Sequence, residues 1–432
     1  MQFHSTKNQN LKASLEEAIF KSLPADNGLY MPDAIPNLPK RFLEALPDLS
    51  FNEIAEEVTL NLLGDDLTKA EVQQIVGRAF DFYAPVVPLT DDLYVLELFH
   101  GPSMAFKDFG ARYMASLMSH FLSKSDKEIH ILVATSGDTG GAVAQGFHGV
   151  PGIRVTILYP SGKVSEIQEK QLTTLGGNVT ALEVNGTFDD CQSLVKQAFL
   201  DQELNRKFNL SSANSINISR LIPQSFYYFS AYAQLAKSGK PVVFSVPSGN
   251  FGNLSAGLLA WKMGLPVEKF IAATNLNNVV PRYLDSGSYH PEPSVATLSN
   301  AMDVGNPSNF VRLSRLLNDD LHTTRNMVAG YYFDDRQTQA AMREVNELFD
   351  YVVCPHTAVA YLGLKDFLGN RAGQVNGIFL STAHPAKFLE LVEDTLGQKI
   401  TIPENLEKLL SKEKKSIKMS ASFADFKSWL LQ

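Results

Sequence analysis

Eight short apolar runs, separated by helical patterns, constrain the fold more than any other feature of this sequence. They span residues 94–98, 129–134, 154–159, 179–184, 242–246, 270–274, 328–333 and 377–380. Continuous apolar strands of this kind are typical of parallel sheets that are covered on both faces. Amphipathic stretches lie between them, among them 109–121, 187–200, 254–263 and 336–349. The alternation predicts an α/β fold with two doubly wound, largely parallel sheets.

The first 94 residues follow a different pattern. Residues 15–23 and 52–63 have helical periodicity, and five prolines punctuate the chain between them. We therefore expect an N-terminal helical segment over residues 1–94, an α/β domain over 95–235 and a second α/β domain over 236–432 that ends in a helix at 423–431. Residues 283–309, rich in Pro, Ser, Gly and Asn, predict a long connection between elements. The lysine-rich run 408–418 predicts a solvated helix face or a linker.

Composition excludes several classes of protein. A net charge of −8 disfavours nucleic acid or an anionic membrane as a partner. Two cysteines in 432 residues are typical of a reducing compartment. No apolar segment resembles a secretory signal or approaches the roughly 20 residues that span a bilayer. The nine histidines are scattered, and H-E-x-x-H, C-x-x-C, P-loop and G-x-G-x-x-G motifs are absent. We therefore expect a cytoplasmic protein without a metal site.

One lysine lies at an unusual place, the start of a predicted helix. Lys107 follows the apolar residues 104–106 and precedes the pattern at 109–121. The free N–H groups of a helix N-terminus carry partial positive charge, which disfavours a cation and should lower the pKa of the amine. A neutral amine is what Schiff-base formation with an aldehyde requires. On position alone, however, a surface lysine with its head group in water explains the residue better.

Three polar loops follow predicted strands. Residues 247–253 (Pro-Ser-Gly-Asn-Phe-Gly-Asn) follow the run 242–246, and their glycines, amides and hydroxyl are suited to hold a phosphate. Residues 135–141 (Thr-Ser-Gly-Asp-Thr-Gly-Gly) form a second junction of this type, whose N–H groups suit a carboxylate if Asp138 points away from it. The third loop is 381–385. Each loop also fits an ordinary tight turn or helix cap, so none is diagnostic by itself.

In combination and in order, these segments resemble the threonine synthase family of fold type II pyridoxal-phosphate enzymes. The resemblance begins at 3–7 (Phe-His-Ser-Thr-Lys) and 26–32 (Asp-Asn-Gly-Leu-Tyr-Met-Pro), and continues through 106–108, 135–140, 211–217 with Arg220, and 247–253. The N-terminal segments resemble the long bacterial and fungal branch of the family. The resemblance implies the tryptophan synthase β-like architecture of fold type II and pyridoxal 5′-phosphate as the cofactor.

The resemblance also implies roles for individual residues. Lys107 resembles the lysine that forms the Schiff base and moves protons. The cofactor-binding positions are those of the phosphate loop and the hydroxyl residue at the pyridine nitrogen: Ser248, Gly249, Asn250, Phe251, Gly252, Asn253 and Thr382. Ser136, Gly137, Asp138 and Thr139 match the loop near the substrate carboxylate and the cofactor ring. The shorter branch has Asn in place of Asp138, which leaves a contact of Asp138 with the cofactor open. Ser211, Asn214 and Arg220 match positions that hold the substrate phosphate.

The implied reaction is that of a pyridoxal-phosphate-dependent lyase in threonine biosynthesis. It converts O-phospho-L-homoserine and water to L-threonine and phosphate by γ-elimination and addition of water at Cβ. Two alternatives stay open: a related phospholyase that adds no water, and a non-catalytic relic of the fold that only binds. The presence of Lys107 and of the phosphate loops argues against the relic. As partners we expect this small-molecule substrate and neither nucleic acid nor membrane, and we favour a monomer.

Overall fold

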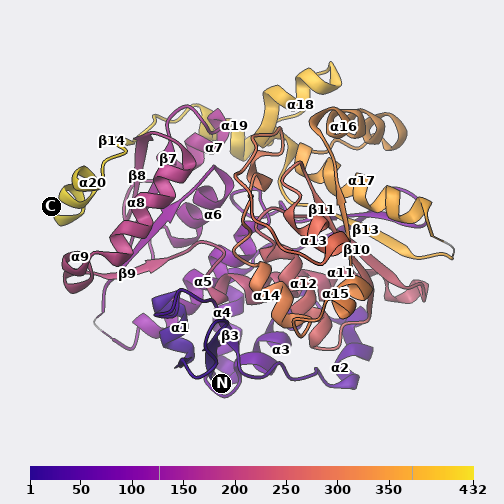
Figure 1. Ribbon diagram of the computed structural model, residues 1–432, viewed down its shortest axis with the longest axis horizontal. Helices are drawn as coiled ribbons and strands as arrows, with labels where there is room; N and C mark the ends of the chain where they lie inside the picture. The colour runs from indigo at the N-terminus through magenta and orange to yellow at the C-terminus, as the bar shows by residue number, and fades with distance from the viewer. Residues whose placement is uncertain (126, 372) are drawn as a thin grey trace.

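Two open sheets and one small antiparallel sheet organise the chain, of which the computed structural model describes residues 1–125, 127–371 and 373–432 (Figure 1). The first open sheet has the order β14-β8-β7-β6-β9, and its neighbouring strands pair in parallel. Its strands are β6 (Ile129–Ala134), β7 (Ile153–Pro160), β8 (Val179–Asn185), β9 (Asn209–Ser212) and β14 (Ile417–Ser420).

The second open sheet has the order β12-β11-β10-β13-β5-β4. Its edge strand β4 is antiparallel to β5, whereas the other neighbours pair in parallel. Its strands are β4 (Val86–Pro88), β5 (Leu93–Glu97), β10 (Val242–Pro247), β11 (Val267–Thr274), β12 (Val328–Tyr332) and β13 (Asn376–Ser381). All eight predicted runs are strands, and the predicted α/β class is confirmed.

Both faces of the central strands β6, β10 and β13 are buried, which explains why their sequences are largely apolar. In β10, Phe244 and Val246 belong to one hydrophobic cluster and Val243 to another. In β6, Val133 belongs to that first cluster, whereas Leu132 faces a third one. Since successive side chains of a strand point to opposite faces, each sheet needs an apolar layer on either side.

Helices supply these layers (Figure 1). The outer face of the second sheet packs on α16 (Asp335–Phe349) and α17 (Pro355–Gly369). The outer face of the first sheet packs on α8 (Phe188–Leu200), α9 (Gln202–Lys207) and α20 (Phe423–Leu431). The inner faces of both sheets share the largest cluster, which includes α5 (Lys107–Leu122), α6 (Asp138–Phe147), α11 (Phe226–Leu235) and α12 (Gly252–Lys262). The two sheets are therefore joined through one core.

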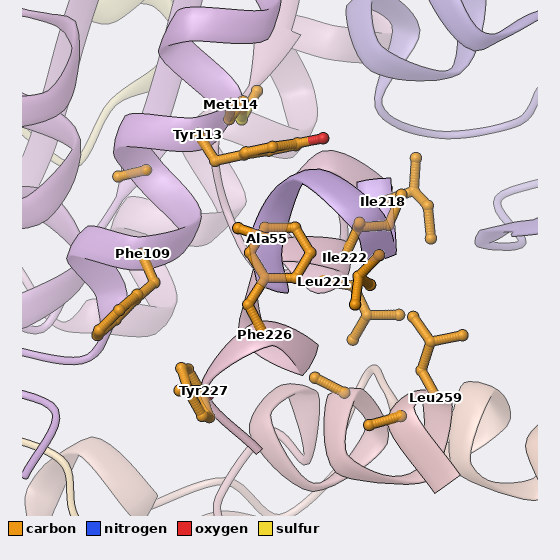
Figure 2. Packing of buried hydrophobic residues seen from close by; sticks show 14 of the residues in the cluster. Ala55, Phe109, Tyr113, Met114, Ile218, Leu221, Ile222, Phe226, Tyr227 and Leu259 are labelled. Carbon is orange, nitrogen blue, oxygen red and sulfur yellow. The ribbon is translucent and has the colours of Figure 1, made fainter. Parts of the chain in front are cut away.

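Aromatic side chains at the centre of this core fix the position of α5. Figure 2 shows Phe109 and Tyr113 of α5 facing Phe226 and Tyr227 of α11. The ring centroids of Phe109 and Tyr227 lie 5.2 Å apart, and those of Tyr113 and Phe226 lie 5.6 Å apart. Full burial of one such side chain stabilises the fold by roughly 1.5–3 kcal/mol. Because α5 begins at Lys107, this packing also fixes the predicted Schiff-base lysine.

The N-terminal segment is not wholly helical, which corrects the prediction for residues 1–94. Its helices are α1 (Leu15–Lys21), α2 (Lys40–Ala45), η1 (Leu46–Asp48), α3 (Phe51–Leu63) and α4 (Lys69–Ala79). It also contains the antiparallel sheet β2-β1-β3, formed by β1 (Phe3–Ser5), β2 (Lys12–Ala13) and β3 (Tyr30–Pro32). Strands of two or three residues are too short to show a period of two, so no periodic pattern predicts them.

Two strands cross the predicted domain boundaries. β5, expected in the domain 95–235, pairs with β13 in the sheet of the following domain. β14 begins at the end of the run 408–418 predicted as a solvated helix face or linker, yet it pairs with β8 of the preceding predicted domain. Packing between segments distant in sequence decides such pairings. The boundaries 94/95 and 235/236 otherwise stay a prediction.

The remaining elements are short. They are α7 (Glu166–Thr173), α10 (Ile218–Leu221), η2 (Ile222–Ser225), η3 (Ala236–Ser238), α13 (Val279–Ser286), η4 (Asn300–Met302), α14 (Phe310–Leu316), α15 (Leu321–Met327), η5 (Pro385–Phe388), α18 (Leu389–Leu396) and α19 (Glu404–Leu410). Between α13 and α14 the chain is largely irregular, as predicted for residues 283–309. Among the described helices, none has the length and apolar character needed to cross a bilayer.

Candidate active site

A cavity of about 620 Å³ lies where the carboxyl ends of strands from both sheets meet. In open α/β sheets this edge is the usual place for a ligand, because loops there converge on one crevice. The predicted site residues that line it are Lys107, Ser136, Asp138, Thr139, Asn214, Arg220, Ser248, Gly249, Asn250, Phe251, Gly252, Asn253 and Thr382. Four motifs from distant parts of the chain thus meet in one place.

Two predicted residues do not line the cavity. Ser211 lies on β9, and its hydroxyl is 3.0 Å from Oγ of Ser22. We therefore do not assign Ser211 to the substrate phosphate. Gly137 has a φ of 133°, a conformation that glycine adopts readily, and its N–H donates to Oγ1 of Thr135 at 3.0 Å. This glycine shapes the turn that presents Ser136 and Asp138.

Lys107 lies at the cavity wall, half-buried, with Nζ 5.6 Å from the centroid of the Phe106 ring. Burial, together with the positive charges of Lys387 and Arg220, lowers the pKa of the amine to about 8 against the opposing charge of Asp138. The predicted direction is confirmed, but burial is the main cause. An amine with this pKa can act as a nucleophile and as a base near neutral pH.

Asp138 forms a buried ion pair that the sequence analysis missed. Nζ of Lys387 lies 2.7 Å from Oδ1 of Asp138, and Nε2 of Gln168 donates to the same oxygen at 3.0 Å. Although burial opposes it, the charges of Lys387 and Lys107 hold the pKa of Asp138 well below its usual range. Lys387 lies only five residues after Thr382, but nothing in its local sequence distinguishes it from a surface lysine.

The loop between β10 and α12 fits a phosphate. In the described part of the chain, the backbone N–H groups of residues 249–254 have no acceptor. Oδ1 of Asn253 accepts hydrogen bonds from Tyr227 and Tyr228, both at 2.7 Å. Its Nδ2 is buried, and no described residue accepts from it. Since buried donors normally have partners, this cluster indicates a site for an anion.

Gly249 must be glycine for a steric reason. A Cβ at this position would lie 2.6 Å from Cα of Met302 in the opposite wall of the cavity. At Gly252, in contrast, the nearest atom to a Cβ would be Nδ2 of Asn309 at 3.5 Å, an ordinary contact. The protein therefore requires a glycine at 249, whereas any steric requirement at 252 comes from a ligand.

Arg220 and Asn214 form a second polar region of the cavity. The buried guanidinium of Arg220 donates through Nη1 to the carbonyl oxygen of Ala213, and its Nε has no partner in the described residues. Burial lowers the pKa of Arg220 to about 10, with Asp108 opposing, so the side chain stays cationic at neutral pH. Nδ2 of Asn214 donates to the carbonyl oxygen of Ala134 at 3.1 Å. The remaining donors suit a second anion.

The two polar regions are hydrogen-bonded to each other through Ser215, a residue without a predicted role. Nδ2 of Asn250 donates to Oγ of Ser215 at 2.7 Å. Behind them, the fully buried Arg312 donates to the carbonyl oxygens of Ser215 at 3.1 Å, Ile216 at 2.7 Å and Tyr30 at 3.0 Å. These bonds fix the segment before Arg220 against the phosphate loop. Arg312 lies nearly 100 residues from Ser215, so sequence reasoning had no signal for it.

Thr382 and His356 complete the wall around Lys107. The carbonyl oxygen of Thr382 accepts from the N–H of Phe106 at 2.9 Å, so the residue that follows β13 directly holds the residue before Lys107. Burial lowers the pKa of His356 to about 4, and its Nε2 accepts from the N–H of Ala301 at 3.2 Å. His356 is therefore neutral at physiological pH.

Comparisons with known proteins show the family of the chain. The family models that match are "Threonine synthase N terminus" at residues 2–80, "Pyridoxal-phosphate dependent enzyme" at 84–377 and "Threonine synthase, C-terminal" at 357–429. The threonine synthase of Escherichia coli is 45% identical, with 100% of this chain and 99% of that protein covered. That of Saccharomyces cerevisiae is 36% identical, with 96% and 94% covered.

Solved structures are similar over the same length. The threonine synthase structure from Escherichia coli matches with a TM-score of 0.93 and 44% identity, covering 100% of this chain and 99% of that one. A pyridoxal-phosphate-bound threonine synthase from Brucella melitensis matches with a TM-score of 0.93 and 33% identity, covering 100% and 98%.

Proposed function

The chain belongs to the threonine synthase family of pyridoxal-phosphate-dependent enzymes, and on this premise we propose that its cavity converts O-phospho-L-homoserine and water to L-threonine and phosphate. Membership makes the protein a lyase of amino-acid biosynthesis with pyridoxal phosphate as its cofactor. One observation supports this substrate above others: an amine with a lowered pKa lies in one cavity with two separate groups of unpaired donors.

The residues of the cavity fit the cofactor. We assign its phosphate to the N–H groups of residues 249–254 and to Nδ2 of Asn253, its aldehyde to Lys107 and its ring nitrogen to the hydroxyl of Thr382. When bound, pyridoxal phosphate supplies an electron sink that stabilises negative charge on the carbon atoms of the amino acid. A hydroxyl at the ring nitrogen, in place of a carboxylate, leaves that nitrogen largely neutral.

Lys107 is the residue we assign to proton transfer at Cα. With a pKa of about 8, the amine is partly neutral at physiological pH and can take the Cα proton, then return a proton later in the cycle. Arg220 and Asn214 would hold the phosphate that leaves from Cγ, since a guanidinium keeps its charge there and offers a fork of donors. The N–H groups of Ser136 and Thr139 would orient the substrate carboxylate.

The decisive experiment follows all products of phosphohomoserine turnover by the purified, cofactor-loaded chain. Equal amounts of threonine and phosphate support the proposal. Phosphate with a keto acid would identify a phospholyase that adds no water. A protein that shows the cofactor's visible absorption but makes no product would be a binding relic. Borohydride reduction followed by peptide mass spectrometry should place the label on Lys107, and Lys107→Ala is the matched control.

We also propose that the enzyme works as a monomer in the cytoplasm. Both cysteines, Cys191 and Cys354, are free and buried, which fits a reducing compartment. Sedimentation of the loaded protein at several concentrations tests the oligomeric state, and cell fractionation tests the location. A sedimentation coefficient that rises to that of a dimer at low micromolar concentration would refute the monomer.

A further inference from the structure

Lys107, Asp138 and Arg220 line the cavity, and the fully buried Lys387 lies against Asp138. Lys107 comes from α5, Asp138 from α6, Arg220 from α10 and Lys387 from η5. Asp138 interacts with both lysines. Its negative charge partly opposes the lowering of the Lys107 pKa, and its carboxylate forms the ion pair with Lys387. Two amines are thus available to one carboxylate, and when Asp138 pairs with one of them, the other has no counterion.

In the structure, the carboxylate of Asp138 pairs with Lys387. The ion pair between Lys387 and Asp138 is 2.7 Å long, with the two side chains 0% and 6% exposed. Nζ of Lys387 also donates to the carbonyl oxygen of Ser103 at 2.8 Å, and Gln168 supports Asp138 from the other side. Within the described residues, no hydrogen bond or ion pair joins Asp138 to Lys107.

We propose that Lys387 is a positioning residue: by holding the Asp138 carboxylate in this ion pair, it keeps the carboxylate from pairing with Lys107 and leaves that amine free to react. The inference rests on the proposed role of Lys107 and adds the residue that maintains it. The other ionisable groups near Lys107 do not replace this function. Arg220 is a cation, and His356 is neutral at physiological pH.

Opposite effects of the two partners on Lys107 distinguish this role from a structural one. Lys387→Met removes a cation but keeps a long side chain, so the unpaired Asp138 turns to Lys107 and raises its pKa. Asp138→Asn removes the one anion that supports the charged form of Lys107, so the pKa falls. The double variant removes both charges together and should return the pKa to an intermediate value.

The test measures Lys107 in the full-length chain freed of cofactor, so that it does not depend on turnover. The wild type, both single variants and the double variant are labelled with acetic anhydride between about pH 6 and about pH 11, a range that includes the ordinary lysine pKa. Peptide mass spectrometry then gives the midpoint for each lysine. The exposed Lys163, which also lines the cavity, is the internal control and should keep one midpoint in all four proteins.

We expect the Lys107 midpoint to rise by about one unit or more in Lys387→Met, as for a carboxylate that approaches an amine. The neutral amine at pH 7 then falls roughly tenfold. In Asp138→Asn the midpoint should fall below that of the wild type. Single variants that shift the midpoint in the same direction, or leave it unchanged while Lys163 stays constant, would overturn the proposal.

An unpaired buried carboxylate is costly, so Lys387→Met is checked for folding by circular dichroism. Should it fail to fold, Lys387→Gln takes its place, because it removes the cation but keeps an amide that can donate to Asp138 and to Ser103. A Lys107 midpoint in Lys387→Gln that equals the wild-type midpoint would refute the role of Lys387. A chain that shows these shifts but makes no threonine would support this inference and refute the proposed function.

Discussion

The cavity contains two junctions of the same local design that differ in how their backbone donors are used. Both run from a parallel strand to the N-terminus of a helix, β6 to α6 and β10 to α12. At α6, Oγ1 of Thr135 accepts from the N–H groups of Gly137 at 3.0 Å and Gly140 at 2.8 Å, and the helix begins with a carboxylate, Asp138. At α12, the N–H groups of 249–254 have no acceptor within the described ranges, and the loop carries no charged side chain.

This difference shows how a general anion-binding element acquires a specific task. The α12 junction keeps a full set of donors for a phosphate, which carries more charge than a carboxylate. At the α6 junction, the N–H groups of Gly137 and Gly140 donate within the turn itself. This junction also carries the Asp138 carboxylate, whose charge Lys387 neutralises. Local sequence alone makes both junctions look like anion sites. The neighbours of each junction decide how strongly an anion binds.

Lys107 lies between the two junctions, and its loss should have the largest effect. Lys107→Ala removes the amine that we assign to both the cofactor aldehyde and the Cα proton. We expect turnover to fall roughly 10³-fold or more, since general acid–base catalysis alone contributes 10²–10⁴-fold. Initial rates of threonine formation measure this effect. Activity within tenfold of the wild type would remove Lys107 from the mechanism.

A side chain at Gly249 should disrupt the set of free N–H donors at the α12 junction and so weaken binding of the cofactor phosphate. Gly249→Val places atoms against the backbone of Met302, so the loop must move and its donors diverge. A distortion that costs about 3 kcal/mol weakens cofactor binding roughly 100-fold. Fluorescence titration with pyridoxal phosphate measures the affinity. Gly252→Ala is the comparison: the protein has room for its Cβ, so a loss of affinity there would come from contact with the phosphate itself. Unchanged affinity in Gly249→Val would mean that the steric argument is wrong.

Asn253→Asp makes the α12 junction resemble the α6 junction. The shape and the acceptor for Tyr227 and Tyr228 are kept, but the unpaired Nδ2 donor becomes an acidic oxygen facing the phosphate. Losing a hydrogen bond to a charged group costs about 1.5–3 kcal/mol, which predicts at least tenfold weaker cofactor binding. The same titration measures it. Unchanged affinity would place the phosphate elsewhere.

The lowered pKa of Lys107 predicts a pH dependence with a definite sign. Below about pH 8 the amine is mostly protonated, so the neutral fraction falls tenfold for each further unit of pH. The rate at which the cofactor-free chain takes up pyridoxal phosphate should therefore rise with pH and level off above about pH 8. Stopped-flow absorbance measures this rate. A midpoint near the ordinary lysine value of about 10.4 would contradict the environment described for Lys107.

The smallest effect is expected at Thr135. Thr135→Val removes the acceptor for Gly137 and Gly140 without changing the size of the side chain. Leaving two buried donors unpaired should destabilise the protein by about 1–3 kcal/mol for each, in part offset by water. Thermal unfolding measures the loss, and cofactor affinity should stay within a few-fold. A large loss of cofactor affinity would show that the two junctions are not independent.

The sequence by itself determined the longer strands, the class of fold and the chemistry of the motifs. Continuous apolar runs report burial on both faces, and glycine-rich junctions report backbone donors, because both signals are local. For this reason eight strands of the two open sheets are predicted, whereas β4, β9 and β14 are not, and most of the predicted site residues line one cavity. Local patterns also placed Lys107 at the start of its helix.

Tertiary structure alone decided which segments meet. β14 pairs with β8 more than 200 residues away, and Oδ1 of Asp138 pairs with Lys387 rather than with Lys107. Ser211, although part of a recognised motif, faces Ser22 instead of the cavity. These contacts depend on packing across the whole core, which no local pattern encodes. The tertiary structure also decides the charge state of the Lys107 amine, because burial and charges from distant segments set its pKa.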